Sequence, residues 1–279
     1  MDDLLPLREA DFRWVAALLY DRFGIKLGEQ KRILVAGRLQ KRVRQLGLAG
    51  FAEYFAFLRA DSSGTELVEL VNRLTTNHSF FYREKEHFEF LVKEILPGIA
   101  RDYAKIANYP LRIWSAGCAA GEEAFTIAIM LRENLGRYLP AADAGILASD
   151  ISIQVLTEAK AATYSSQRLR ELPPVYRSNY FAKVGEDAYE VIPAVRSLVL
   201  FKRLNLMSEK FPFKGAFDVV FCRNVMIYFD QDVRKRLVRS IYSVLKPGGY
   251  LFIGHSESLQ RDDCPLDYIK PAIYRKGCA

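Results

Sequence analysis

The sequence predicts an α/β protein in two parts: a small all-helical domain, then a doubly wound, mostly parallel sheet that carries a small antiparallel β insertion. Up to about residue 95, apolar residues recur three and four positions apart, which is typical of amphipathic helices. From about residue 110, short apolar runs alternate with helical stretches, as in strands joined by crossover helices. The 279 residues, half of them hydrophobic and 26% charged, have room for two packed cores.

The helical part contains four amphipathic patterns separated by short glycine or serine breaks. We expect this domain over residues 1–80, a linker helix over 81–95 and the sheet domain over 96–279. The four patterns are DFRWVAALLYDRF (11–23), KRILVAGRLQKRVRQL (31–46), FAEYFAFL (51–58) and TELVELVNRL (65–74).

The sheet part alternates apolar runs with helical patterns, and it is interrupted once. Over about 165–203, polar and apolar residues alternate in AYEVIPAV and SLVLFKRL, which predicts the antiparallel insertion. The tail DYIKPAIYRK also alternates, and we expect it to close the sheet with antiparallel strands. The main strands are predicted at LRIWSAG (111–117), GILASD (145–150), FDVVFC (217–222) and YLFIGHS (250–256).

Composition excludes several classes of protein. No apolar run approaches the roughly 20 residues of a membrane-spanning helix. The acidic amino terminus MDDLLPLREAD does not resemble a secretory signal, so we expect a cytoplasmic protein. The four cysteines form no CxxC pair and the three histidines are far apart in the sequence, which predicts free thiols and no metal site.

The net charge of +7 is concentrated in one segment. Between Arg22 and Arg44 there are eight basic residues and one acid, Glu29, so the local surplus equals that of the whole chain. Such a basic surplus is compatible with binding to nucleic acid, with binding to an acidic protein surface, or with no binding role.

Two features at predicted strand ends indicate a ligand site. The strand LRIWSAG runs into the turn Gly117–Gly121 and then a helix, an arrangement that lets a ligand approach the backbone and favours anionic groups. The alternative is a small-residue turn that any doubly wound protein needs. The strand GILASD ends on Asp150, which could bind a ribose diol or, together with Ser152, cap the next helix.

Five motifs, in order, resemble those of the CheR family of chemotaxis receptor methyltransferases, and the resemblance covers nearly the whole chain. The family uses S-adenosylmethionine to esterify glutamate side chains on the cytoplasmic helices of receptors, leaving S-adenosylhomocysteine. The resemblance implies a Rossmann-like methyltransferase sheet. The motifs are TNHSFFYRE (76–84), WSAGCAAGEEAFTIA (114–128), ASDIS (148–152), FCRNVMIYFD (221–230) and LKPGGYLFIGHSESL (245–259).

The resemblance also implies roles for individual residues. It places Arg83 and Tyr228 at the reacting centre and implies no metal. Ser79 occupies a position where relatives often have threonine, and serine keeps the hydroxyl group. The implied cofactor contacts are Asn77, Ser79, Arg83, Glu122, Asp150, Asn205, Leu206, Arg223 and Asn224.

Without the resemblance, Arg83 would be interpreted as a surface ion-pair partner and Tyr228 as a half-buried aromatic. The implied chemistry needs no general base, because a glutamate with a pKa near ~4.3 is already an anion at neutral pH. The rate acceleration would come from alignment of the carboxylate with the methyl group and from removal of water around both reactants.

The basic segment forms one face of a predicted helix. If Val35, Leu39, Val43 and Leu46 are buried, then Lys31, Arg38, Lys41 and Arg42 fall in one sector of roughly 100° beside them. We expect these four residues to bind acidic receptor helices; the alternative is an ordinary solvated face.

Two other functions remain open at this point. A methyltransferase of similar fold could act on nucleic acid, and the chain could be a binding module that senses S-adenosylmethionine without turnover. We expect receptor helices as partners, no nucleic acid, no membrane insertion and a monomer. In some family members the insertion binds a receptor carboxyl-terminal pentapeptide. Because the turn in KVGEDAYEV is short, we expect that this chain does not depend on it.

Overall fold

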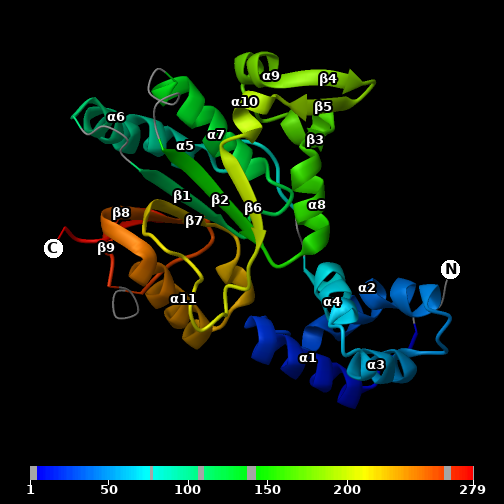
Figure 1. The fold of residues 1–279 in the computed structure, drawn as a ribbon. Helices are drawn as coiled ribbons and strands as arrows, with labels where there is room; N and C mark the ends of the chain where they lie inside the picture. Colours follow the sequence, from blue (N-terminus) through cyan, green and yellow to red (C-terminus); the bar gives the residue numbers. More distant parts are fainter. Residues whose placement is uncertain (1–4, 76–77, 106–109, 137–142, 261–264, 279) are drawn as a thin grey trace. The chain divides into compact units, whose positions relative to one another are not determined.

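The computed structural model describes residues 5–75, 78–105, 110–136, 143–260 and 265–278. These residues fall into two compact units. One comprises Met1–Thr76 and Tyr228–Val233, and the other comprises Asn77–Ile227 and Arg234–Ala279. Figure 1 shows the elements of both.

The first unit is helical, as predicted. Its apolar positions at helical spacing form the core, including Phe12, Val15 and Leu19 of one helix and Val35 and Leu39 of another, all at most 1% exposed. The elements are α1 (Glu9–Phe23), η1 (Glu29–Lys31), α2 (Arg32–Gln45), α3 (Phe51–Ala60) and α4 (Thr65–Leu74).

The second unit is built on a seven-stranded sheet with the order β6-β2-β1-β7-β8-β10-β9. The strands from β6 to β8 pair in parallel, whereas β10 is antiparallel to both β8 and β9. The predicted mostly parallel sheet with an antiparallel closing hairpin is therefore confirmed. The strands are β1 (Leu111–Ala116), β2 (Ala144–Asp150), β6 (Val199–Arg203), β7 (Phe217–Cys222), β8 (Leu245–Ile253), β9 (Asp267–Lys270) and β10 (Ile273–Arg275).

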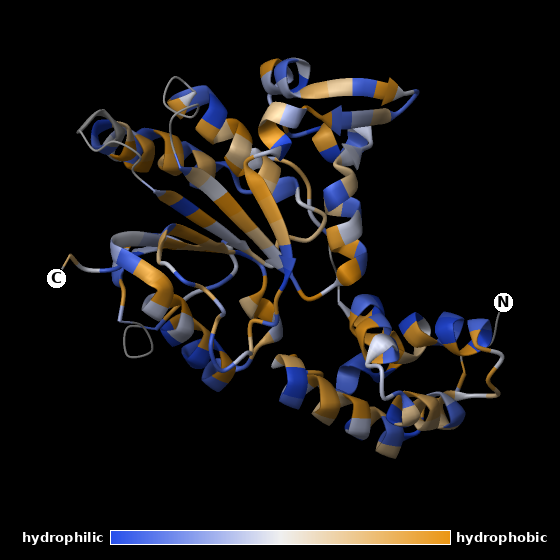
Figure 2. Ribbon diagram, in the orientation of Figure 1, coloured by the Kyte–Doolittle hydropathy of each residue, from blue (hydrophilic) through white to orange (hydrophobic). Residues whose placement is uncertain are grey.

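Helices cover both faces of this sheet. In Figure 1, α6 and α7 lie on one face and α11 lies on the other. Figure 2 shows that the strands between them are mostly hydrophobic, and every residue of β7 is buried. The linker helix that we expect over residues 81–95 begins at Lys85. The helices are α5 (Lys85–Phe90), the π-helical η2 (Leu91–Ile95), α6 (Leu96–Lys105), α7 (Glu122–Leu135), α8 (Ile153–Ala161), the 3₁₀ turn η4 (Met226–Tyr228) and α11 (Gln231–Val244).

The insertion contains a three-stranded antiparallel sheet of order β3-β5-β4, as predicted. One part of the prediction is wrong: SLVLFKRL does not belong to that small sheet. It forms β6, which pairs in parallel with β2 at the edge of the main sheet, with Phe201 opposite Ala148. The elements are β3 (Thr163–Tyr164), η3 (Ser166–Leu169), α9 (Pro174–Tyr180), β4 (Phe181–Gly185), β5 (Ala188–Val191) and α10 (Pro193–Arg196).

Among the described residues, none of the helices has the length and apolar character needed to cross a membrane. The thiols of Cys118, Cys222 and Cys278 are free, as predicted for those three. Cys222 is completely buried in β7, where it packs as a small apolar residue.

Candidate active site

The predicted ligand residues gather where the chain order of the strands reverses. The sheet runs outward from β1 to β2 and β6, and then returns to β7 on the other side of β1. In open α/β sheets, ligands bind outside the carboxyl ends of the strands at such a switch point. Asp150 ends β2, Glu122 begins the helix after β1, and Asn205 and Arg223 follow β6 and β7, so the topology places all four at this edge of the sheet.

The glycines of the turn after β1 are required by the protein's own packing. Gly117 has φ +81° and Gly121 has φ +93°, a conformation that favours glycine. A Cβ at Gly117 would collide with Val225, and one at Gly121 would lie 3.1 Å from atoms of Ala159, Phe201 and Tyr164. These contacts support the small-residue turn interpretation for both glycines.

Asp150 closes the end of β2 onto this turn. Its Oδ2 accepts a hydrogen bond from the Ala119 amide at 3.0 Å, and its Oδ1 accepts one from the Ser152 amide at 2.9 Å. Ser152 caps α8, with its Oγ accepting from the Val155 amide at 3.2 Å. Burial raises the pKa of Asp150, and the bonds from the backbone amides oppose that rise. Asp150 therefore shapes the turn, while Ser152 supplies the helix cap.

Glu122, the first residue of α7, is fully buried. Arg168 of η3 forms an ion pair with its Oε1, yet neither carboxylate oxygen has a hydrogen-bond partner among the described residues. Burial raises the pKa of Glu122, and Arg168 opposes this rise. A buried carboxylate with unused acceptor capacity can accept hydrogen bonds from a cationic donor such as an amino group. S-adenosylmethionine carries such an amino group, so the Glu122 carboxylate is a suitable acceptor for it.

Asn205 and Leu206 follow β6, the neighbour of β2. Asp150 and Arg203 lie opposite each other in the parallel pair, and the Leu204 amide donates to the Asp150 carbonyl at 3.0 Å. Asn205 and Leu206 are half-buried directly beyond this point. Ser79 is also half-buried, whereas Asn77 lies outside the described residues.

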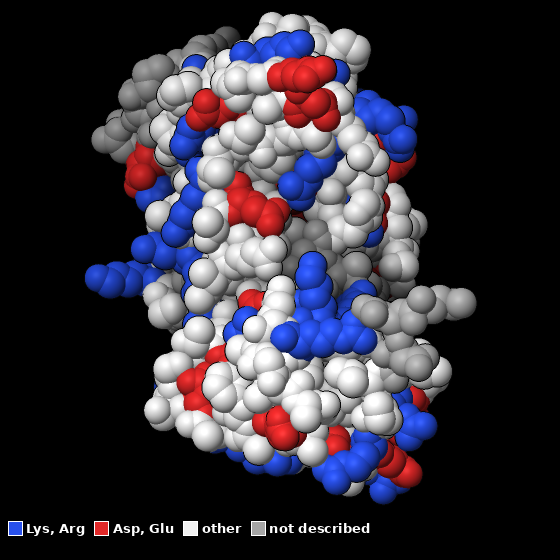
Figure 3. Space-filling model, turned by 90° about the vertical axis from the view of Figure 1, so that its right-hand side faces the viewer, with Lys and Arg blue, Asp and Glu red and all other residues white. Residues whose placement is uncertain are grey.

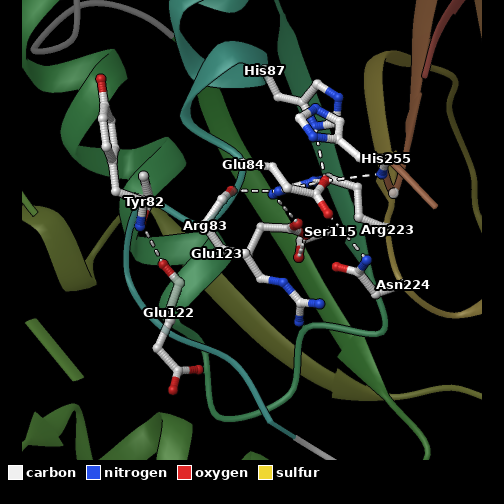
Figure 4. A network of polar contacts seen from close by, with 12 residues as sticks. Tyr82, Arg83, Glu84, His87, Ser115, Glu122, Glu123, Arg223, Asn224 and His255 are labelled. Carbon is white, nitrogen blue, oxygen red and sulfur yellow. Dashed lines mark hydrogen bonds and ion pairs between the residues drawn. The ribbon is translucent and has the colours of Figure 1, made fainter. Parts of the chain in front are cut away.

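Arg223 lies at the centre of a buried polar network (Figure 4). Its side chain is 2% exposed, and its guanidinium contacts Glu84 at 3.0 Å and Glu123 at 2.9 Å. It also donates to the main-chain carbonyl of Arg83. Asn224 donates to Glu84 at 3.2 Å. The guanidinium of Arg223 is therefore occupied by protein groups, and the cofactor contact implied for this residue stays a prediction that concerns its main chain.

Arg83 is half-buried beside this network. Its Nη1 donates to the His78 carbonyl at 3.0 Å, and its guanidinium lies 6.0 Å from the centre of the Phe80 ring. Its neighbours Tyr82 and Glu84 both have left-handed backbone conformations, with φ of 65° and 56°. Non-glycine residues in this region cost of order 1–3 kcal/mol and concentrate at functional sites.

Two histidines that are far apart in the sequence lie together in the fold. The rings of His87 and His255 are 4.6 Å apart, and their nitrogens lie within 4.8 Å of each other and of a Glu84 oxygen. Burial and the charge of Arg223 lower the pKa of His87 to about 3. Because Glu84 is already paired with Arg223, a dication there would meet a nearby positive charge. This arrangement does not favour a metal.

Tyr228 belongs to the helical unit, where it ends η4. Its side chain is half-buried, and its carbonyl accepts a hydrogen bond from the Lys26 amide at 2.9 Å. Its implied place at the reacting centre stays a prediction.

The predicted basic face is divided between exposed and internally bonded residues. Val35, Leu39 and Val43 are buried as expected, whereas Leu46, predicted to be buried with them, is half-buried. Arg42 lies in an ion pair with the buried Glu66, with nitrogen–oxygen distances of 3.0 and 2.5 Å. Among the other basic residues, Arg38 donates to the Leu74 carbonyl at 2.6 Å, Lys41 is exposed and Lys31 is half-buried.

Sequence reasoning missed three residues that hold the site together. Glu84 and Glu123 were inside the quoted motifs, but nothing in the local sequence showed that both bind Arg223. Arg168 belonged to no motif, although it forms the ion pair with Glu122.

A doubly wound sheet with carboxylates at its switch point defines an α/β protein of the nucleotide-cofactor-binding class. Residues 77–273 match the family described as CheR methyltransferase, SAM binding domain, and residues 10–75 match CheR methyltransferase, all-alpha domain. The chain belongs to the CheR methyltransferase family, and its larger part corresponds to the family's S-adenosylmethionine-binding domain.

Three relatives are each named chemotaxis protein methyltransferase. The one from Borreliella burgdorferi is 43% identical over 260 residues, covering 93% of this chain and 92% of the relative. The one from Klebsiella aerogenes is 40% identical over 265 residues, covering 94% and 87%. The one from Escherichia coli is 37% identical over 266 residues, covering 92% and 87%.

Proposed function

We propose that this protein transfers a methyl group from S-adenosylmethionine to glutamate side chains on the cytoplasmic helices of chemotaxis receptors. The observation that carries the proposal is the similarity over nearly the whole chain to chemotaxis protein methyltransferases. The carboxylates gathered at the sheet's switch point support the cofactor part of it. We further propose that residues 1–80 form the receptor-facing domain and 96–279 the catalytic domain, with the protein acting as a cytoplasmic monomer.

The cofactor supplies an electrophilic methyl group on a sulfonium. In this proposal Asp150 holds a ribose hydroxyl and the buried Glu122 accepts hydrogen bonds from the amino group. Ser79, Asn77, Asn205, Leu206 and Asn224 complete the contacts. The side chain of Asn224 is anchored on Glu84, which leaves its neighbouring backbone as the surface for the cofactor.

The acceptor glutamate is already ionised at neutral pH, so its carboxylate oxygen can attack without a general base. Arg83 has a guanidinium that can hold a carboxylate in a bidentate pair, and we assign it to orientation of the acceptor or the cofactor carboxylate. Tyr228 is assigned to the methyl path. The protein therefore contributes alignment and exclusion of water.

The test is transfer of labelled methyl from S-adenosylmethionine to a panel of receptor cytoplasmic fragments, with Arg83→Ala as the comparison. We expect base-labile label on receptor glutamates with the wild-type chain and strongly reduced label with the variant. An RNA and DNA arm tests the nucleic acid alternative. Figure 3 shows one face of the molecule, on which both basic and acidic side chains are present and several basic ones are grouped together. S-adenosylmethionine binding without transfer to any acceptor would support the sensing module.

We also propose that the chain recognises the receptor without the carboxyl-terminal pentapeptide. The β4–β5 hairpin has a tight turn, with Gly185 paired to Ala188, and Asp187 of this turn accepts a hydrogen bond from the Ser166 amide at 2.8 Å. Titration with that pentapeptide should show no binding at micromolar concentrations.

A further inference from the structure

We propose that the Arg223 guanidinium positions Arg83: it holds the Arg83 carbonyl and the Glu84 side chain and acts on methyl transfer through them, without itself contacting the cofactor. This inference rests on the proposed function, and within it on the role in which Arg83 orients the acceptor carboxylate.

Four of the five N–H donors of Arg223 bond to acceptors within the protein. Its Nη1 donates to Glu123 at 2.9 Å, its Nη2 donates to Glu84 at 3.0 Å and to the carbonyl of Arg83, and its Nε donates to Glu84 at 3.3 Å. The Phe88 ring covers the guanidinium at 5.3 Å. With 2% of the side chain exposed, a ligand has almost no surface of this residue to contact.

The two carboxylates are in turn fixed to the sheet. Ser115, in β1, donates to Glu123 at 2.6 Å. The side chain of Asn224 and the amide of His255 donate to Glu84 at 3.2 and 3.3 Å. The network in Figure 4 therefore joins the ends of β1, β7 and β8 to the segment before α5. Satisfied buried networks of this kind rigidify the groups that they connect.

The direction of the Arg83 side chain depends on the backbone conformation of residues 82–84, which Arg223 contacts. Tyr82 and Glu84 both adopt left-handed conformations, and such conformations persist only where the surroundings impose them. Arg223 contacts the carbonyl of Arg83, which lies between these two strained positions, and the side chain of Glu84, which is one of them. A shift of this backbone would redirect the Arg83 side chain, and misplacement by about 1 Å can reduce turnover about 100-fold.

The test is a double-mutant cycle with Arg223→Lys and Arg83→Ala in the full chain. Lysine keeps the charge and loses the planar fork, so it cannot hold both carboxylates and the carbonyl. We expect Arg223→Lys to lower kcat at least tenfold, with the Kd for S-adenosylmethionine from calorimetry within twofold of wild type. In the Arg83→Ala background the same substitution should change kcat less than twofold.

Lys246→Gln is the matched control. Lys246 forms an ion pair at 2.8 Å with the buried Asp218, near the amino end of the strand that Arg223 follows. It should lower Tm and leave kcat within twofold. An equal loss of kcat in this control would attribute the Arg223 effect to general destabilisation. A raised Kd with unchanged kcat would make Arg223 a cofactor contact, and additive losses in the cycle would separate it from Arg83.

Hydrogen exchange separates this inference from the proposed function. In Arg223→Lys, amides of residues 80–85 should exchange at least tenfold faster, while those of residues 111–116 in β1 stay protected. Unchanged exchange at 80–85 overturns the positioning role whatever the acceptor. Absence of methyl transfer by the wild-type chain with accelerated exchange in the variant would instead overturn only the proposed receptor substrate.

Discussion

The carboxylate of Glu122 and the guanidinium of Arg168 form an ion pair in which the glutamate is fully buried and the arginine is 30% exposed. Glu122 opens the helix after β1, and Arg168 belongs to the insertion. The Arg168 carbonyl also accepts a hydrogen bond from the Phe81 amide at 3.2 Å. The insertion therefore supports both the buried Glu122 carboxylate and the segment that contains Phe81.

Arg168→Met should destabilise the protein by about 2–3 kcal/mol, because it leaves a buried carboxylate without its charge partner. Adding Glu122→Gln to that variant should restore part of the loss, since the buried charge is gone. Denaturant unfolding measures both. Equal stability of wild type and Arg168→Met would show that the pair contributes nothing.

Asp150→Ala should weaken S-adenosylmethionine binding by about 1–3 kcal/mol, measured by calorimetry. The change removes the proposed ribose partner and leaves the amides of Ala119 and Ser152 without their acceptor. Asp150→Asn keeps an acceptor for one of them and should lose less. An unchanged Kd in the alanine variant would remove Asp150 from the cofactor site.

Arg83→Ala and Tyr228→Phe should both lower kcat of the folded protein. The arginine change should cost more, because it removes a charge that orients a reactant, whereas the tyrosine change removes one hydroxyl and keeps the ring. Initial rates of methyl transfer, with circular dichroism as the folding control, compare them. Wild-type rates in both would place the reacting centre elsewhere.

Charge reversal should separate the two kinds of basic residue in the helical domain. Lys31→Glu with Lys41→Glu should raise KM for the receptor and leave Tm nearly unchanged, with an effect that fades as salt screens charges over about 8 Å. Arg42→Glu should instead unfold the domain more easily, because it places a second carboxylate against the buried Glu66. If the lysine variant had the same receptor kinetics as wild type at low salt, these lysines would belong to an ordinary solvated helix face with no role in receptor binding.

His87 should make stability fall on acidification. Burial first, and then the charge of Arg223, lower its pKa from 6.5 to about 3 in the folded state, so the unfolded chain binds more protons between these values. Stability is then lost as pH falls from about 6.5 towards about 3, by roughly 5 kcal/mol at most. His87→Gln should show a shallower decline in urea unfolding over this range. Parallel curves for the two proteins would mean that His87 does not titrate on unfolding.

The sequence by itself determined the order of the elements and the residues of the motifs. Helical spacing predicted the core of α2 through Val35, Leu39 and Val43, because a helix buries one stripe whatever it packs against. Alternation of strand and helix patterns predicted the parallel sheet, and the position of Asp150 at a strand end predicted its place at the switch point. Each of these signals lies within a short stretch of chain.

Only the tertiary structure decided which distant residues became partners. Alternation in SLVLFKRL suits any half-exposed strand, so it did not distinguish a place in the small sheet from β6 at the edge of the main one. Arg223 and Glu84 are 139 residues apart, and His87 and His255 are also far apart in sequence, yet both pairs meet at the end of the sheet. A side chain's charge is visible in the sequence, but the group that neutralises it depends on which strands lie side by side. For that reason the sequence could present Arg223 as a cofactor contact, while the folded sheet buries it between two carboxylates.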